Sequence, residues 1–151
     1  MVRITIYLAL FAILGISAHS TELPQELPAE VKVVERIEDF LSDNPGEALV
    51  ELQPELRAQT RFYTLGRRVS GDRHVAYARG VNSYPSLRDV TATVRYSGAI
   101  ITYIQVSVTQ TSNLGRVYTT SGGIGQRSIV FVVEARSTLQ FNYNVDIYGR
   151  N

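Results

Sequence analysis

Cysteine and tryptophan are absent from the chain of 151 residues, and lysine and methionine each occur once. Without cysteine, the protein can form no disulfide bond, no thiolate metal site and no cysteine nucleophile. Histidine is also scarce, since His19 and His74 are the only two. Because zinc sites draw most of their ligands from histidine and cysteine, we expect no metal, and nothing in the sequence suggests another cofactor.

Catalytic side chains are equally few. Asp72 lies two residues before His74 and could share its strand face, which would give the best acid–base pair in the chain. The alternative is that Gly71 and Asp72 form a turn, with the Asp72 carboxylate accepting hydrogen bonds from nearby backbone amides. No Gly-x-Ser-x-Gly motif is present to supply a serine nucleophile. We therefore expect that the protein is not an enzyme.

Only one long apolar run occurs, from Ile4 to Ile16. It follows Arg3 and precedes the small residues Ala18 and Ser20, which is the pattern of a secretory signal peptide. The run is too short to span a bilayer. Residues 1–20 are therefore predicted to be a signal peptide, cleaved after Ser20 or Ala18. The mature protein would be extracellular, free of disulfides and without membrane attachment.

The net charge of +1 hides a strong asymmetry. Residues 21–60 carry ten acidic and three basic side chains, a balance of −7, whereas residues 61–151 carry eleven arginines and four acidic side chains, a balance of +7. The two parts attract each other. The acidic part is either a clamp or pro-segment that shields an arginine-bearing surface, or a solvated arm. Arginine in place of lysine favours defined carboxylate partners.

The hydrophobic pattern changes near Thr60. Before it, apolar residues recur every three or four positions over residues 31–41, and a shorter pattern of this kind covers residues 47–52, so this acidic segment is expected to be partly helical. After it, apolar and polar residues alternate, which predicts half-buried strands. We expect about seven strands, at residues 61–65, 73–79, 90–96, 104–108, 116–121, 129–133 and 141–147.

This pattern predicts an all-β fold, with a single antiparallel β-sandwich or barrel-like domain at residues 61–151. Residues 21–60 precede it as the acidic segment. Among the tyrosines, Tyr96 and Tyr143 fall on apolar faces of their strands, whereas Tyr103 and Tyr148 fall on polar faces and are candidates for an exposed aromatic surface.

The glycine-rich stretch from Gly122 to Gly125 lies between two expected strands. It could cradle an anion beside Arg127, but it lacks the Lys-Ser/Thr of a phosphate-binding loop. A tight connection that requires positive backbone torsion angles explains the glycines better.

Three short motifs together resemble the insect multiprotein bridging factor 2 family. They are Gly-Arg-Arg-x-x-Gly-Asp-Arg at residues 66–73, Gly-Gly-x-Gly-Gln-Arg at 122–127, and Val-Asp-Ile-Tyr-Gly-Arg at 145–150. The resemblance covers about residues 61–150 and implies a small β domain without assigned catalytic residues. Between Arg136 and Phe141 the chain reads Ser-Thr-Leu-Gln, where we expect a glycine-containing turn.

The family is named for a transcriptional coactivator that bridges a nuclear receptor to the general transcription machinery. Many members resemble small secreted proteins of saliva, gut or haemolymph, and the apolar start of this chain agrees with those. The first hypothesis is therefore a secreted protein that acts by binding an unknown protein or anionic partner. The alternative is the coactivator. The sequence has no clustered basic run and no DNA-reading element, so no nucleic-acid partner is expected.

The candidate site residues fall into two groups. Arginines expected to bind a partner, or to dock the acidic segment, are Arg67, Arg68, Arg73, Arg79 and Arg127. Motif residues expected to hold the structure are Gly71, Asp72, Gly122, Gly123, Gly125, Gln126, Tyr148 and Gly149.

Overall fold

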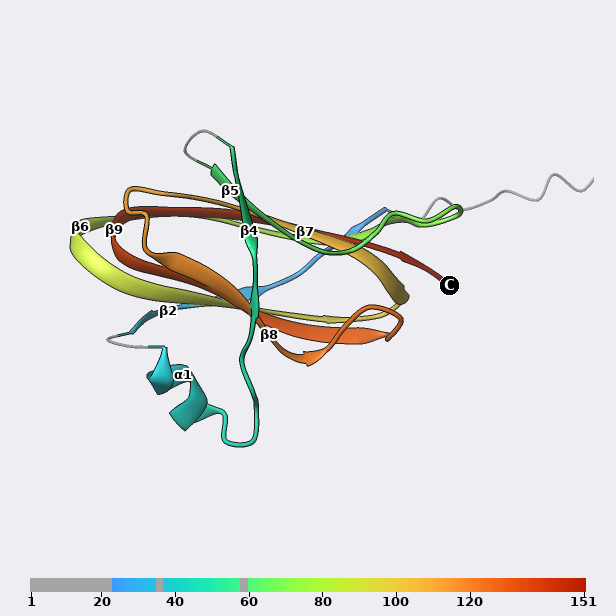
Figure 1. Ribbon diagram of the computed structural model, residues 1–151, viewed down its shortest axis with the longest axis horizontal. Helices are drawn as coiled ribbons and strands as arrows, with labels where there is room; N and C mark the ends of the chain where they lie inside the picture. The colour runs from blue at the N-terminus through green and yellow to red at the C-terminus, as the bar shows by residue number, and fades with distance from the viewer. Residues whose placement is uncertain (1–22, 35–36, 58–59) are drawn as a thin grey trace, which may run out of the picture.

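The computed structural model describes residues 23–34, 37–57 and 60–151, and the expected signal peptide lies outside them. The described chain contains one helix and nine strands (Figure 1). In order they are β1 Gln25–Glu26, β2 Ala29–Val34, α1 Glu38–Asp43, β3 Val50–Leu52, β4 Pro54–Arg57, β5 Thr60–Gly66, β6 Arg73–Ser97, β7 Ile100–Gln110, β8 Gly115–Gly122 and β9 Ser128–Arg150. The all-β prediction is confirmed. No helix among these residues is long and apolar enough to cross a membrane.

All nine strands join one mixed sheet, built around the long antiparallel pair β6 and β9. Each of these two strands contains two of the expected strands, because neither strand is interrupted at the bend. The register slips between Ser83 and Arg88 of β6, opposite Thr138 of β9. Beside it, Ser137 has a φ of 50° and is the described non-glycine residue with positive φ. Where we expected a glycine-containing turn between Arg136 and Phe141, the chain thus forms a bend within β9.

The bend divides the sheet into two layers (Figure 1). The first layer contains β1, the start of β6, the end of β9, β7, β5 and β4. The second layer contains β2, the end of β6, the start of β9, β8 and β3. One core cluster takes side chains from both, such as Ala78, Val106 and Val145 from the first and Val94 and Phe131 from the second. The two layers therefore pack face to face.

The prediction that residues 31–41 form a helix is wrong in its first part. Residues 29–34 form β2, which pairs with the end of β6, and the helix is only α1. Residues 50–52 of the second expected helix also form a strand, β3. Val31 and Val33 are β-branched and prefer an extended backbone when a sheet edge is available. Only β1 pairs in parallel, with β6, so the sheet is antiparallel elsewhere.

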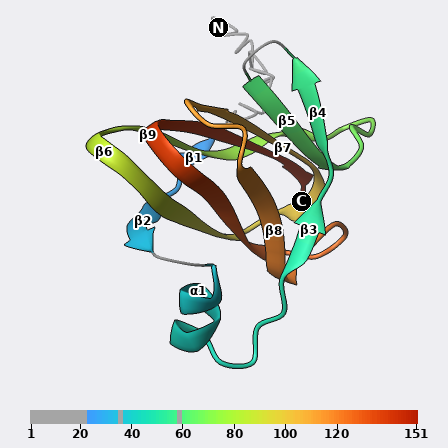
Figure 2. The same ribbon diagram turned by 60° about the vertical axis from the view of Figure 1, so that its left-hand side comes forward.

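Helix α1 lies below β2 and β8 in Figure 2, at the opposite end of the view from β5 and β7. Its Phe40 is buried and lines a small hollow together with Thr91 and Thr93 of β6. These two threonines occupy the outer face of the second layer but are buried as well. The acidic segment is thus part of the packed structure, through β1 to β4 in the sheet and α1 on its outer face.

Candidate functional site

The first motif forms a loop between β5 and β6 that Asp72 holds in place. Its carboxylate accepts hydrogen bonds from Arg68 Nη2 at 2.7 Å, from the Val69 amide at 2.9 Å and from Thr102 Oγ1 at 3.0 Å. The Arg68 guanidinium and the Val69 amide lower the pKa of Asp72 to about 2. The side chain is 2% exposed. Asp72 is therefore a structural carboxylate in a turn.

Arg68 is also held by the third motif. Its guanidinium carbon lies 3.8 Å from the centroid of the Tyr148 ring. Tyr148 in turn lies between His74 and Tyr103, with ring centroids 5.0 and 5.9 Å away. The predicted binding residue Arg68 thus joins the loop to β9, although half of its side chain remains exposed. Tyr103 and Tyr148 are only partly exposed because they pack in this row.

All three motif segments meet at the first residues of β7. The backbone amide of Arg67 donates to Thr102 O at 3.1 Å, and that of Gly125 donates to Ile101 O at 2.8 Å. The Ile101 amide donates to Gln126 O at 2.8 Å. At Gly149, a Cβ would lie only 2.7 Å from Ile100 O. Residues far apart in the sequence therefore form one end of the molecule, which we call the motif end.

The motif glycines adopt backbone conformations that other residues rarely adopt. Gly71, Gly122, Gly123 and Gly125 all have positive φ, at 80°, 74°, 152° and 81°. Gly66 has a φ of 76°, and a Cβ there would lie 2.3 Å from Thr102 O and 2.6 Å from Ile124 Cδ1. Ile124 can pack over the first loop only because residue 66 has no side chain.

The motif end contains an apolar hollow of about 400 Å³. Exposed Arg67 and Arg150 lie on the same hollow, and neither forms an ion pair within the described part of the chain. The hollow is lined by Gly66, Arg67, Val69, Ile100, Ile101, Thr102, Ile124, Gly125 and Arg150. This end thus combines apolar surface with positive charge.

The remaining predicted arginines lie in two places. Arg127 donates to Gly98 O at 3.2 Å, and Arg73 donates to Asn151 Oδ1 at 3.4 Å, both at the motif end. Arg79 lies further along β6 on the outer face of the first layer, where it donates to Asn144 Oδ1 at 2.8 Å. The structure therefore groups four of the five predicted arginines and leaves Arg79 apart.

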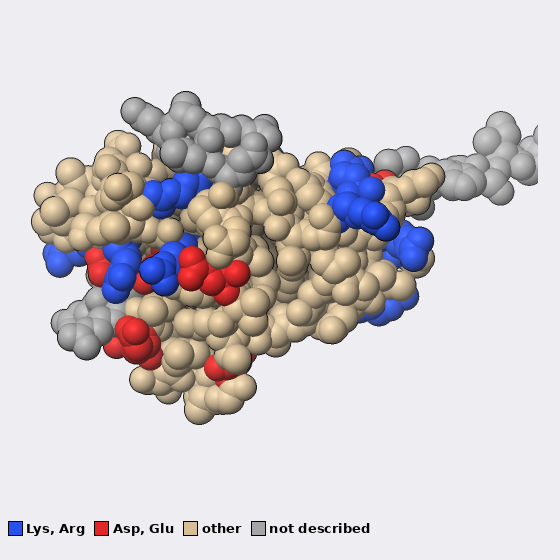
Figure 3. Space-filling view, in the orientation of Figure 1, with Lys and Arg blue, Asp and Glu red and all other residues tan. Residues whose placement is uncertain are grey.

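Arg150 belongs to the same group and was missed as a binding residue. The signal was present, because Arg150 ends the third motif. In a space-filling view, the charged side chains at the right-hand end of the molecule are mostly basic, whereas basic and acidic side chains lie next to one another at the left (Figure 3).

His74 does not pair with Asp72. Its Nε2 lies 3.1 Å from Asp146 Oδ1, while Asp72 faces Arg68. The acid–base pair considered from the sequence is thus not formed. The described residues also contain no group of three or more histidine, aspartate or glutamate side chains that could hold a metal ion.

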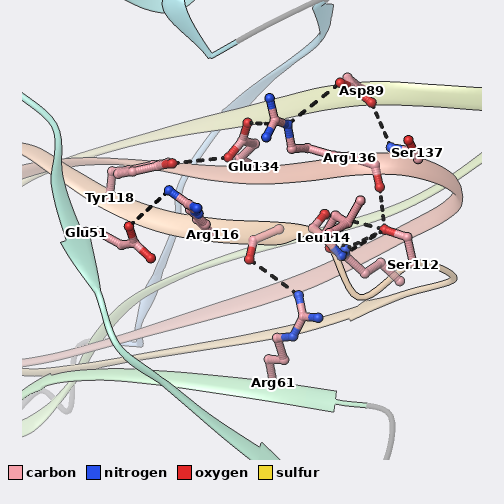
Figure 4. A network of polar contacts seen from close by, with 12 residues as sticks. Glu51, Arg61, Asp89, Ser112, Leu114, Arg116, Tyr118, Glu134, Arg136 and Ser137 are labelled. Carbon is pink, nitrogen blue, oxygen red and sulfur yellow. Dashed lines mark hydrogen bonds and ion pairs between the residues drawn. The ribbon is translucent and has the colours of Figure 1, made fainter.

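A second polar cluster lies in the second layer around Glu134, which is 2% exposed (Figure 4). Tyr118 donates to Glu134 Oε2 at 3.2 Å, and Arg136 Nε lies 3.3 Å from Oε1. Arg136 also lies 3.9 Å from Asp89. Burial raises the pKa of Glu134. Glu134 follows the expected strand at residues 129–133, and no sequence pattern indicates that its carboxylate is buried.

Acidic residues of the N-terminal segment also pair within the second layer. Glu47 lies 3.9 Å from Arg95, and Glu51 lies 3.3 Å from Arg116. Neither carboxylate contacts the arginines of the motifs. These pairs stabilise the packing of residues 37–57 against the sheet, which differs from the expected shield over Arg67, Arg68, Arg73 and Arg79.

A family model described as Transcription activator MBF2 matches residues 65–149, which is more than half of the chain and includes most of each motif. Among curated proteins and solved structures, none matches the chain. The match overturns the expectation of a secreted, extracellular protein, because the family is described as one of transcription activators. It agrees better with the alternative drawn from the sequence.

Proposed function

This chain belongs to the Transcription activator MBF2 family, and on that premise we propose that it acts as a transcriptional coactivator that binds other proteins and catalyses no reaction. The observation that carries the proposal is the convergence of the three motifs at the motif end. They build a surface where Arg67 and Arg150 lie beside apolar side chains and have no carboxylate partner among the residues that the structure describes.

The construction of the motif end suits a rigid binding surface. Backbone hydrogen bonds from the first and second motifs fix the start of β7, and the Arg68–Asp72 pair fixes the loop that carries Arg67. A surface that is already ordered loses little conformational entropy when a partner binds. Its positive charge would speed association with an acidic protein and reject basic ones.

A reporter assay tests this function. The full chain is expressed in cells with a reporter gene that is driven by a nuclear receptor, and both reporter output and the location of the chain are measured. We expect the wild-type chain to enter the nucleus and raise output. We expect the double variant R67E/R150E to lose most of this increase.

The control is R88E, which makes the same arginine-to-glutamate substitution once, at an exposed arginine near the bend. It should keep the activity of the wild type. Exclusion of the wild-type chain from the nucleus, or unchanged output when it is present there, would contradict the coactivator function.

A further inference from the structure

The hollow at the motif end has the size and lining of a binding pocket. Its volume of about 400 Å³ lies within the range of about 300–1,000 Å³ that is common for ligand pockets. Val69, Ile100 and Ile124 supply an apolar lining, and Ile124 is 40% exposed. Such a lining would favour a large apolar side chain of a ligand, because binding removes both apolar surfaces from water.

The charges around the hollow define the rest of the ligand. Arg67 follows β5 and Arg150 ends β9, so the two guanidinium groups come from separate segments. Arg95, Arg116 and Arg136 each have an acidic partner within the chain, whereas Arg67 and Arg150 have none among the described residues. A ligand with more than one carboxylate would complement them.

We propose that this hollow binds an acidic, apolar segment of a partner protein. A large apolar side chain of the segment occupies the space against Ile100 and Ile124, and carboxylates on either side of it pair with Arg67 and Arg150. The inference rests on the proposed coactivator function and names the chemistry of the partner. Segments that alternate acidic and apolar residues are typical of disordered activation domains.

A peptide segment fits better than a small apolar carboxylate such as a fatty acid. A fatty acid has one carboxylate, whose single charge balances only one of the two arginines, whereas a peptide segment can carry several carboxylates. Arg73 and Arg127 extend the positive charge beyond the hollow at the same end of the molecule. Only a ligand longer than the hollow could use that additional charge.

The test is a fluorescence anisotropy titration with the full chain. The probe is a fluorescein-labelled synthetic peptide of alternating glutamate, leucine and phenylalanine residues. We expect R67E/R150E to bind it at least about tenfold more weakly than the wild type, and R88E to bind it like the wild type. Thermal unfolding should be similar for all three, because the changed side chains are exposed.

Three further measurements separate the parts of the proposal. Ile124→Ala should weaken binding several-fold, and so should replacement of the leucines and phenylalanines of the peptide by alanine. Higher salt should weaken the wild-type complex more than the R67E/R150E complex, because the variant has lost the arginine–carboxylate pairs that salt would screen. Dodecanoate, at concentrations below the critical micelle concentration of this fatty acid, should not displace the peptide.

Equal weakening by R88E, indifference to the apolar residues of the peptide, or displacement by dodecanoate would each overturn the inference. Loss of reporter activation by R67E/R150E without any peptide binding would refute the acidic, apolar partner and leave the coactivator function standing. Selective peptide binding without reporter activation would refute the coactivator function instead.

Discussion

Arginines in the second layer and at the motif end have different surroundings. In the second layer, Arg116 faces Glu51 and Arg136 faces both Glu134 and Asp89. At the motif end, Arg68 has its carboxylate partner Asp72, but Arg67 and Arg150 have none among the described residues. The chain thus neutralises arginines that stabilise its packing and leaves others beside an apolar hollow.

This difference shows why one arginine of the Arg67-Arg68 pair is structural and its neighbour is not. Arg68 points to Asp72 and Tyr148 and fixes the loop. Arg67 uses only its backbone amide for the fold, in the bond to Thr102 O. Its side chain is exposed and borders the hollow. The predictions below test whether the two regions differ as this account requires.

The largest effect is expected at Gly66. Gly66→Ala would place a Cβ 2.3 Å from Thr102 O at a positive φ, so the loop and Ile124 must move. We expect a loss of at least about 2 kcal/mol in the free energy of unfolding. Gly71→Ala is the matched control, since φ is also positive but no atom lies within 4 Å. It should cost about 1 kcal/mol, and equal losses would contradict the packing argument. Chemical denaturation measures both.

At Glu134, removal of the whole carboxyl group should lower the free energy of unfolding more than removal of its charge alone. Glu134→Ala leaves the buried Tyr118 hydroxyl without its acceptor and creates a cavity, so we expect a loss of about 2 kcal/mol. Glu134→Gln keeps an acceptor for Tyr118 and should cost less.

The pH dependence separates the Glu134 variants further. Because burial raises the pKa of Glu134, the folded protein holds its proton more tightly than the unfolded chain does. The resulting stabilisation is complete at low pH and is lost as pH rises from about 4.5 through the raised pKa. Glu134→Gln should lack this fall, and an unchanged pH profile of unfolding would argue against the buried charge.

Asp72 should have the opposite pH dependence. Its pKa is lowered to about 2 in the fold, so its stabilisation is present above the ordinary aspartate pKa and is lost as pH falls toward 2. Asp72→Asn should therefore destabilise the protein at pH 7 and make little difference near pH 2. Denaturation of both proteins at a series of pH values measures this, and a constant difference would contradict the role of the Arg68 pair.

The smallest effect is expected at the bend. Each positive φ at the motif end belongs to a glycine, whereas Ser137 adopts a φ of 50° at the bend of β9. Ser137→Gly would remove this strain but increase the freedom of the unfolded chain, so we expect a gain of about 0.5 kcal/mol. The hydrogen bond that the Ser137 amide donates to the Asp89 carboxylate would be kept. A measured loss of stability would show that the serine side chain contributes.

The alternating pattern located the strands well, and Tyr96 and Tyr143 are buried as predicted. It did not show that β6 and β9 each continue through a bend, because each was expected as two shorter strands, with a turn between Arg136 and Phe141. Residues 31–34 were expected to be helical because the valine spacing fits both periods, and pairing with β6 stabilises the strand instead.

The motifs located the candidate site more completely than charge alone did. Arg67 and Arg127 were found, but Arg79 was included only because it lies near them in the sequence. The sequence could not separate Arg67 from Arg68, since the choice depends on which side chain faces Asp72. The hollow itself depends on contacts among β5, β7 and β9 that no local pattern contains.

The most direct test of the account is a charge exchange at the motif end. The affinities of the wild type and R67E/R150E are measured for the acidic, apolar peptide and for a matched peptide with lysine in place of glutamate. We predict that the wild type prefers the acidic peptide and that R67E/R150E prefers the lysine peptide, while R88E behaves like the wild type. If R67E/R150E keeps the wild-type preference, the arginines beside the hollow are not a binding surface.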